Sequence, residues 1–137
     1  MSPAAIRALC LSFPGATETI QWGNERVFKV GGKMFAVIGA ERGADAMSFK
    51  ASDESFRLLT DLPGLGPAPY LARAQWVKLA PLAALPDADL AAYLRRAYEI
   101  VAGRLPRKTR EALAAPKNRT ASARRPARRS FRAPSRS

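Results

Sequence analysis

The stretch Arg26-Val-Phe-Lys-Val30, Gly31-Gly32, Lys33-Met-Phe-Ala-Val-Ile38 decides the fold. Two runs rich in β-branched and aromatic residues flank a pair of glycines, which tolerate the positive φ angles of a tight two-residue turn. The stretch therefore predicts an antiparallel β-hairpin. Counting back from the turn predicts four cross-strand pairs: Val30 with Lys33 and Phe28 with Phe35 on one face, and Lys29 with Met34 and Val27 with Ala36 on the other.

Local patterns on both sides of the hairpin predict further strands and connections. Residues 46–50 alternate in polarity and residues 75–80 form a β-prone run, so both are predicted strands. Residues 62–69 contain three prolines and two glycines and are predicted to be irregular. Residues 16–24 are predicted to be a polar connection and residues 39–45 a loop.

Three helices are predicted from capping residues and apolar stripes. The first begins at Ser2-Pro3, an N-cap residue followed by proline at the first helical position. A short helix over residues 53–60 follows the N-cap candidate Ser52, and the longest helix covers residues 86–105. Their apolar positions are, in the same order, Ile6, Leu9, Cys10 and Phe13; Phe56, Leu58 and Leu59; and Leu90, Leu94, Ala97, Val101 and Leu105.

The positive charge of the chain is concentrated in its last quarter. Residues 106–137 carry 11 Lys and Arg against Glu111 alone, a net charge of +10, and residues 1–105 carry 12 against 10, which completes the total of +12. The basic segment has few large apolar residues and cannot bury enough apolar area to offset the entropy of ordering. We therefore expect one folded domain over residues 1–105 and a disordered Arg/Ala/Ser/Pro-rich tail over residues 106–137, with room for an extra turn around residues 108–113.

Composition also bears on location and covalent chemistry. The N-terminus lacks a charged leader before an apolar run, and no stretch reaches about 18 uncharged apolar residues, so neither a secretory signal nor a membrane span is predicted. The single cysteine, Cys10, excludes an internal disulfide, and its place on an apolar stripe predicts a buried, inert thiol. We expect a cytoplasmic protein that does not bind membranes.

Histidine is absent, which removes the commonest general base and the commonest metal ligand. Gly31-Gly32-Lys33 lacks the other residues of a phosphate-binding loop, and Gly64-Leu65-Gly66 lacks the third glycine of a dinucleotide-binding fingerprint. The carboxylates cluster at helix starts and connections, where capping and solvation explain them. We therefore expect no enzyme activity, no metal and no cofactor.

Several motifs resemble the MmcQ/YjbR family, in the family's order along residues 5–105. They are Phe13-Pro-Gly-Ala-Thr-Glu18, the hairpin from Val27 to Ala36, Pro67-Ala-Pro-Tyr-Leu-Ala-Arg-Ala-Gln-Trp-Val77, Leu85-Pro-Asp87 and Ala97-Tyr98. The resemblance implies an α+β fold, in which a single compact domain packs N-terminal and C-terminal helices against an antiparallel β-sheet. It also implies DNA binding through projecting β-hairpins, described as a double wing.

The chain departs from this family just before Trp76. Many members have a sequence like His-Met-Asn-Lys-x-His-Trp there, whereas this chain has Tyr70-Leu-Ala-Arg-Ala-Gln75-Trp76. Any role for an imidazole is therefore absent, and Arg73 is the retained basic position. Residues 106–137 lie largely outside the family pattern, so the resemblance implies nothing about them.

Nucleic acid is the first predicted partner, with DNA as the first choice and binding that is weak or non-specific. Candidate phosphate contacts in the domain are Lys29, Lys33, Lys50, Arg73 and Lys78. Arginines on a flexible tail bind polyanions without reading sequence: Arg124, Arg125, Arg128 and Arg129. Two alternatives stay open: hairpin lysines that are only a solvated face protecting an edge strand, and a tail that is only a solubilising extension.

The second hypothesis is a module that binds an unknown protein or a small ligand. It places the ligand in a groove near Tyr70, Arg73 and Trp76 and treats the tail as incidental, which suits a domain that is close to neutral. Trp22, Trp76 and Tyr70 can stack on unpaired bases, although such residues more often line a pocket or a core. Burial of Trp76 with no adjoining cavity would count against this hypothesis.

Overall fold

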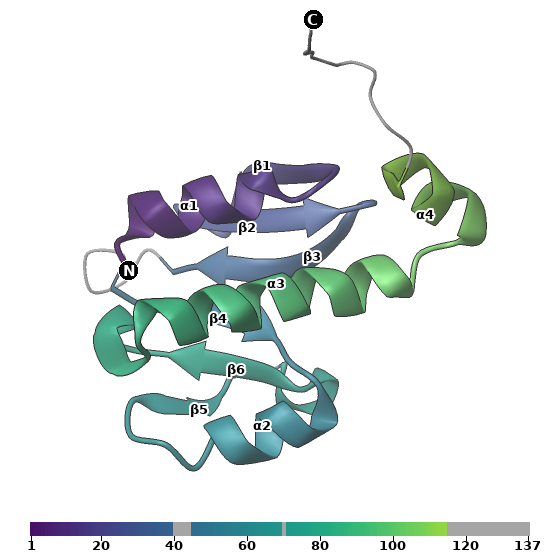
Figure 1. The fold of residues 1–137 in the computed structure, drawn as a ribbon. Helices are drawn as coiled ribbons and strands as arrows, with labels where there is room; N and C mark the ends of the chain where they lie inside the picture. Colours follow the sequence, from purple (N-terminus) through teal and green to yellow (C-terminus); the bar gives the residue numbers. More distant parts are fainter. Residues whose placement is uncertain (40–44, 70, 115–137) are drawn as a thin grey trace, which may run out of the picture. The chain divides into compact units, whose positions relative to one another are not determined.

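The computed structural model describes residues 1–39, 45–69 and 71–114. The chain divides into two units, Met1–Leu105 and Pro106–Ser137. In the first unit, six strands form one antiparallel sheet in the order β1-β2-β3-β4-β6-β5 (Figure 1), which confirms the predicted α+β class. The strands are β1 (Ala16–Gln21), β2 (Glu25–Val30), β3 (Lys33–Ile38), β4 (Met47–Lys50), β5 (Leu65–Pro67) and β6 (Trp76–Leu79).

The helices agree closely with the predicted spans. They are α1 (Pro3–Ser12), α2 (Asp53–Leu59), α3 (Asp87–Gly103) and, in the second unit, α4 (Arg107–Ala114); the short 3-10 helices are η2 (Ala72–Ala74) and η3 (Leu82–Ala84). Ser2 and Ser52 cap α1 and α2, because each hydroxyl accepts a hydrogen bond from the backbone N–H three residues later at 3.1 Å. The extra turn expected around residues 108–113 is the helix α4, and residues 115–137 of the expected disordered tail lie outside the described residues.

The hairpin of β2 and β3 has the predicted turn but a different register. Lys29 pairs with Met34 as predicted, whereas Phe28 pairs with Ala36 and Val27 with Val37, because the register shifts between Phe28 and Lys29. The predicted pairs Phe28–Phe35 and Val27–Ala36 are therefore wrong. The cause is a β-bulge in β3, in which Phe35 is the extra residue. The bulge lets Phe35 and Ala36 both be fully buried.

Residues 16–24 are not simply a connection, as the sequence had suggested. Ala16–Gln21 form β1, which pairs antiparallel with β2 along its whole length. β1 has a neighbour on one side only, and its residues are exposed or half-buried, so it shows no apolar alternation. The β-branched Thr17, Thr19 and Ile20 are the strand signal that the polar composition hid.

Residues 62–69 also contain a strand that the prolines had argued against. β5 pairs with β6 at the opposite edge of the sheet, where Gly66 lies across from Lys78. An edge strand tolerates proline, because one of its two backbone edges needs no partner strand. Pro67 ends this strand.

Helices α1 and α3 cover one face of the sheet (Figure 1). The predicted apolar stripe of α3 is confirmed as buried. An aromatic cluster joins the two helices to β3: the ring centroids of Phe13 and Phe35 lie 5.1 and 5.6 Å from that of Tyr98. The Tyr98 hydroxyl donates a hydrogen bond to the carbonyl oxygen of Pro14 at 2.5 Å, and burial raises the pKa of this phenol.

The face of the sheet opposite α1 and α3, here called the far face, has a smaller core of its own. Strand pairing aligns Val27, Val37, Ser48 and Lys78 in one row across β2, β3, β4 and β6. Val27 and Val37 pack with Trp76 and with Ala68, which follows β5; the half-buried Met34 and Leu71 pack against this cluster.

Helix α2 packs on β5 and β6 through one side only. Leu59 is buried, whereas the side chain of Leu58 is 62% exposed, so the apolar positions of this helix do not all face the core. Adjacent residues of a helix point about 100° apart, and a seven-residue helix at the end of a sheet buries a narrow stripe.

Gly64 and Gly32 allow a matched test of the packing at the β5 edge. Both have φ near +80° (+82° and +79°), but a Cβ on Gly64 would lie 2.6 Å from the Ala84 Cβ, whereas a Cβ on Gly32 would meet nothing within 4 Å. We expect Gly32→Ala to lower the free energy of unfolding by about 1 kcal/mol through backbone strain alone. Gly64→Ala should cost about 1–3 kcal/mol more through overpacking. Urea unfolding of both variants checks this, and equal losses would contradict it.

Candidate functional site

Two of the five predicted cationic residues of the domain lie on the β2–β3 hairpin. Lys33 is exposed at its tip, directly after the Gly31-Gly32 turn, and Lys29 is half-buried on the far face. The tip is therefore the place on the hairpin where a phosphate has access to a lysine. The solvated-face alternative for Lys33 is compatible with the same exposure.

Lys50 does not fit its predicted role as a phosphate contact. Its side chain is only 4% exposed. The Nζ donates a hydrogen bond to the carbonyl oxygen of Ala74 and lies 3.5 Å from the Gln75 Oε1. Burial lowers the pKa of Lys50, and the nearby charge of Arg104 lowers it further, against a smaller opposite effect of Asp53. Lys50 holds the loop before β6 against β4 and is a structural lysine.

Arg73 and Lys78 come from different elements and face different surroundings. Arg73 is exposed on η2, whereas Lys78 is half-buried in β6 on the far face. Lys78 lies on β6 and Lys29 on β2. These two strands are three strand spacings apart, which is about 14 Å at about 4.8 Å for each spacing. The domain cations that the sequence singled out are therefore spread over the surface rather than brought into one cluster.

Five predicted site residues lie outside the described part of the chain. They are Tyr70, Arg124, Arg125, Arg128 and Arg129. Their proposed roles stay predictions. The second unit is described up to Ala114, and its helix α4 exposes Arg107, Lys108 and Arg110.

A groove lies on the far face beside the buried Trp76. Trp76 is 4% exposed and packs on Ala68, Leu71, Met34 and Val37, and these four residues also line the groove. The groove has a volume of about 580 Å³, within the range of small-molecule sites. Its lining comes from the β1–β2 turn, the sheet and the segment after β5: Trp22, Glu25, Met34, Val37, Gly39, Ala46, Met47, Ser48, Ala68, Pro69, Leu71 and Lys78. Trp76 thus belongs to the packed cluster that these four lining residues share, and it does not itself line the groove.

Trp22 at the rim of this groove is unusual in two ways. Its side chain is 63% exposed, and its backbone has φ of +49°, the left-handed region that costs a non-glycine residue about 1–2 kcal/mol. Glycine and asparagine, which accept this conformation readily, stand next to it at positions 23 and 24. The sequence places Trp22 in a connection but gives no sign of the strain, which only the turn geometry reveals.

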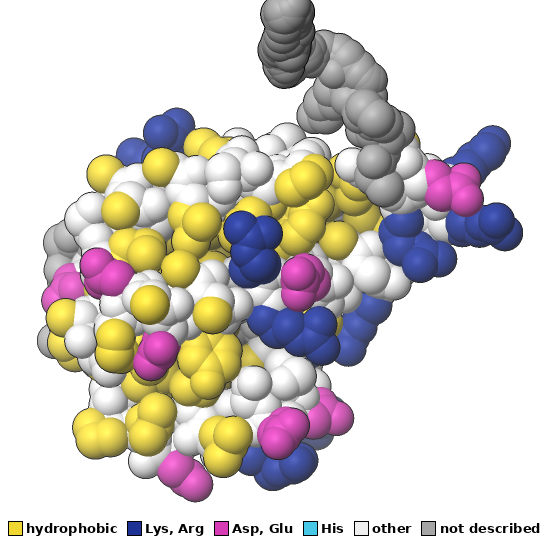
Figure 2. Space-filling model, in the orientation of Figure 1, with side chains coloured by type: hydrophobic (Ala, Val, Ile, Leu, Met, Phe, Trp, Pro, Cys, Tyr) yellow, Lys and Arg dark blue, Asp and Glu magenta, His cyan; other side chains and the backbone are white. Residues whose placement is uncertain are grey.

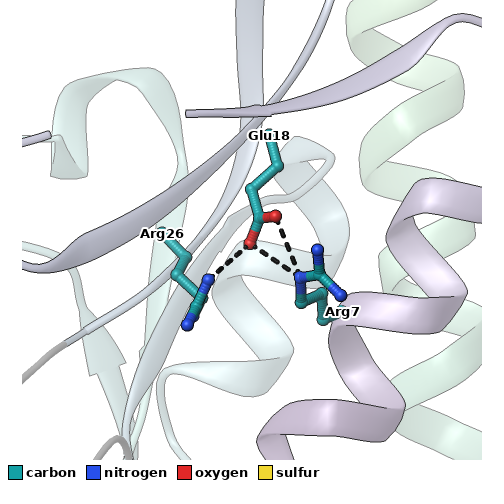
Figure 3. Close-up of polar contacts among 3 residues, drawn as sticks. All are labelled: Arg7, Glu18 and Arg26. Carbon is teal, nitrogen blue, oxygen red and sulfur yellow. Dashed lines mark hydrogen bonds and ion pairs between the residues drawn. The ribbon is translucent and has the colours of Figure 1, made fainter. Parts of the chain in front are cut away.

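Glu18 of β1 forms ion pairs with two arginines on the helix-covered side of the sheet (Figure 3). The Arg7 Nε donates to both Glu18 carboxylate oxygens at 2.9 and 3.1 Å, and an Arg26 terminal nitrogen donates to one of them at 3.1 Å. These charge-assisted bonds join α1 to β1 and β2. Two of the domain's positive charges are therefore used in holding the fold together.

Basic side chains gather around α4 in the space-filling view, whereas basic and acidic side chains are interspersed over the helix-covered side of the domain (Figure 2). Within α4, Glu111 pairs with the Arg107 Nε at 3.0 Å. The charge imbalance of residues 106–137 thus begins in a segment with defined helical structure.

Catalytic and metal-binding groups are sparse in the described residues. Cys10 is fully buried, and burial raises the pKa of its thiol to about 12. Within 1–39, 45–69 and 71–114, no group of three His, Cys, Asp or Glu side chains is placed to hold a metal ion. Across the same part of the chain, no helix has both the length and the apolar character that a membrane crossing needs.

Comparison with known proteins assigns the family. A model of the YjbR family matches residues 11–100, more than half of the chain. The chain belongs to the YjbR family. The crystal structure of protein DR2400 from Deinococcus radiodurans, described as a DUF419 domain, is similar with a TM-score of 0.73 and 22% identity over 89% of this chain and 94% of that chain. At that identity the likeness shows the fold of this YjbR domain alone. No curated protein matches the sequence.

The YjbR match ends at residue 100, so the +10 segment lies outside it. The expected family is confirmed for the folded unit. DNA binding and the double-wing mode of contact stay predictions for this YjbR domain. The descriptions of the family match and of the structural neighbour name no binding partner.

The buried Lys50 predicts a particular dependence of stability on pH. Its pKa is lower in the folded chain than the ordinary 10.5 of an unfolded one, so between these two values the unfolded chain binds more protons. Stability therefore rises with pH in that window. Lys50→Met removes this titration, so the free energy of unfolding of the wild type relative to Lys50→Met should increase from neutral pH up to pH 10.5. Urea unfolding across this range measures it, and a flat or falling difference would contradict it.

Proposed function

We propose that the protein is a non-enzymatic nucleic-acid-binding protein that contacts phosphates chiefly through residues 106–137. The observation that carries this proposal is the distribution of charge: a net +10 over 32 residues beside a domain with a net +2. Each phosphate that a lysine or arginine neutralises releases condensed counterions, so such a segment gains affinity for a polyanion without reading sequence.

The described part of the basic segment supports the proposal. Three of its cations, Arg107, Lys108 and Arg110, are exposed on α4, with one ion pair to Glu111. In the domain, the exposed Lys33 at the hairpin tip offers a weaker, local contact, and the adjacent Gly32, which has open space beside it, lets a backbone approach closely. Lys50 takes no part, because it is buried.

The chemistry of the chain favours binding over catalysis. The sequence has no histidine. Its one thiol is buried with a raised pKa, so it supplies neither a nucleophile nor a metal ligand at neutral pH. DNA is the proposed nucleic acid, because DNA binding is what the resemblance to the YjbR family implies.

Removal of the basic segment is the direct test. All fully buried residues named in the core lie within residues 1–105, so a chain that ends at Leu105 keeps its core. We expect full-length protein to bind a fluorescent duplex with a log–log salt slope of roughly −4.5 to −7, for five to eight phosphate contacts. The chain of residues 1–105 should lose most of this affinity and most of the slope. Fluorescence anisotropy across a salt series measures both, and tight duplex binding by residues 1–105 would contradict the proposal.

Charge reversal at the hairpin tip tests the domain's own contribution. Lys33→Glu should weaken duplex binding by residues 1–105, because the exposed tip lysine is lost and a repelling charge replaces it. Arg57→Glu on α2 is the matched control, since Arg57 is also exposed and its reversal changes the net charge equally. If both variants weaken binding to the same extent, or neither does, the hairpin has no specific role.

A small ligand or a protein partner is the second candidate, and the groove beside Trp76 favours it. Burial of Trp76 without a cavity would have counted against a binding groove, but a groove of about 580 Å³ adjoins that cluster. Its walls are largely apolar and carry few polar side chains, as binding sites do.

A further inference from the structure

The groove on the far face has a defined shape and chemistry. Trp22 in the β1–β2 turn and Glu25 at the start of β2 form one rim, the sheet forms the floor with Val37 and Ser48, and the segment after β5 forms the other wall. That wall is backed by the buried indole of Trp76, which packs on Ala68 and Leu71. The wall thus rests on a packed cluster, which gives a flat ligand a firm surface.

Trp22 is the residue that the fold does not explain. A tryptophan normally contributes to stability by burying its ring, yet this ring is 63% exposed. Its positive φ adds strain where glycine would add none. A strained residue that gains no burial points to a function for its side chain. The exposed indole borders the groove, so its face is available to a ligand there.

The polar residues of the groove suit the edge of a nucleobase. Glu25 supplies an acceptor of the kind that binds exocyclic amino groups of bases, and the Ser48 hydroxyl supplies a donor. Met34, Pro69 and Leu71 supply apolar contact for a flat ring. The negative charge of a carboxylate at the rim repels the phosphates of a nucleic-acid backbone. The groove therefore favours a base that points into it while the phosphates stay outside.

We propose that this groove binds an unpaired base of a single-stranded nucleic acid, stacked on the indole of Trp22. The inference rests on the proposed function, in which residues 106–137, with a net charge of +10, supply the phosphate contacts and the domain adds a contact to a base. Aromatic stacking combined with a basic path for phosphates is how proteins hold single strands without duplex geometry. The domain then prefers single strands, and the basic segment binds either form.

The test compares a single-stranded oligonucleotide with its duplex, using full-length protein. Trp22→Ala should weaken single-strand binding about 5- to 150-fold, the effect of one lost base stack. Duplex binding should stay unchanged, and Trp22→Phe should retain most of the single-strand affinity. Leu58→Ala is the matched control, because Leu58 is equally exposed at 62% but lies on α2 outside the groove. Anisotropy measures all four proteins.

Intrinsic fluorescence gives a second readout. The chain has two tryptophans, Trp22 and the buried Trp76, so stacking on Trp22 should quench the wild-type emission when the oligonucleotide is added. Trp22→Phe leaves only Trp76, and its emission should not respond. Trp22→Gly relieves the positive φ and should unfold at no lower urea concentration than wild type, which separates loss of the ring from loss of the fold.

Several results would overturn the inference. These are an equal loss of single-strand and duplex affinity in Trp22→Ala, no loss at all, or a comparable loss in Leu58→Ala. Binding of a nucleoside monophosphate as tight as that of the oligonucleotide would assign the groove to a free nucleotide instead. Absence of any nucleic-acid binding by full-length protein would end the proposed function as well, whereas a duplex that binds normally with no role for Trp22 ends only this inference.

Discussion

The register of the β2–β3 hairpin is the constraint on which the rest of the domain depends. The Gly31-Gly32 turn fixes the first two pairs, and the bulge at Phe35 then changes the phase of β3 by one residue. Because side chains alternate across a sheet, that single extra residue decides which row faces the helices and which faces away. β4 pairs with β3, and β6 with β4, without a further register shift, so Val37, Ser48 and Lys78 share the face that holds the groove.

Local signals predicted the parts of the fold that local interactions determine. The hairpin carries its turn residues, α1 its N-cap and α3 its apolar stripe within a few positions of sequence. The edge strands β1 and β5 were missed because a strand with one neighbour needs little apolar patterning and tolerates proline. The burial of Lys50 was missed for a different reason, since its partner Ala74 lies 24 residues further along the chain.

The contrast between local signals and long-range packing also explains the roles of the two tryptophans and of the domain's cations. Sequence placed Trp76 in a candidate groove, and packing made it the groove's support while Trp22 became the exposed ring. Lys50 is buried and so is closed to a partner, and one of the two positive charges of Arg7 and Arg26 is balanced by Glu18 within the fold. A net charge says how many cations a chain has, whereas only the fold says which of them remain available. The cations outside the folded core are the ones that dominate the proposed binding.

The position of Cys10 has a consequence for how the protein responds to oxidants. It is the single cysteine of the chain, and its sulfur is fully buried on α1 with little tendency to ionise. Two native molecules therefore cannot crosslink through a disulfide, and peroxide has no thiolate to attack. In the folded domain the thiol should stay unmodified across reducing and oxidising surroundings, and its oxidation should mark only molecules that have unfolded. Loss of the thiol under oxidative stress thus reports how often the domain unfolds.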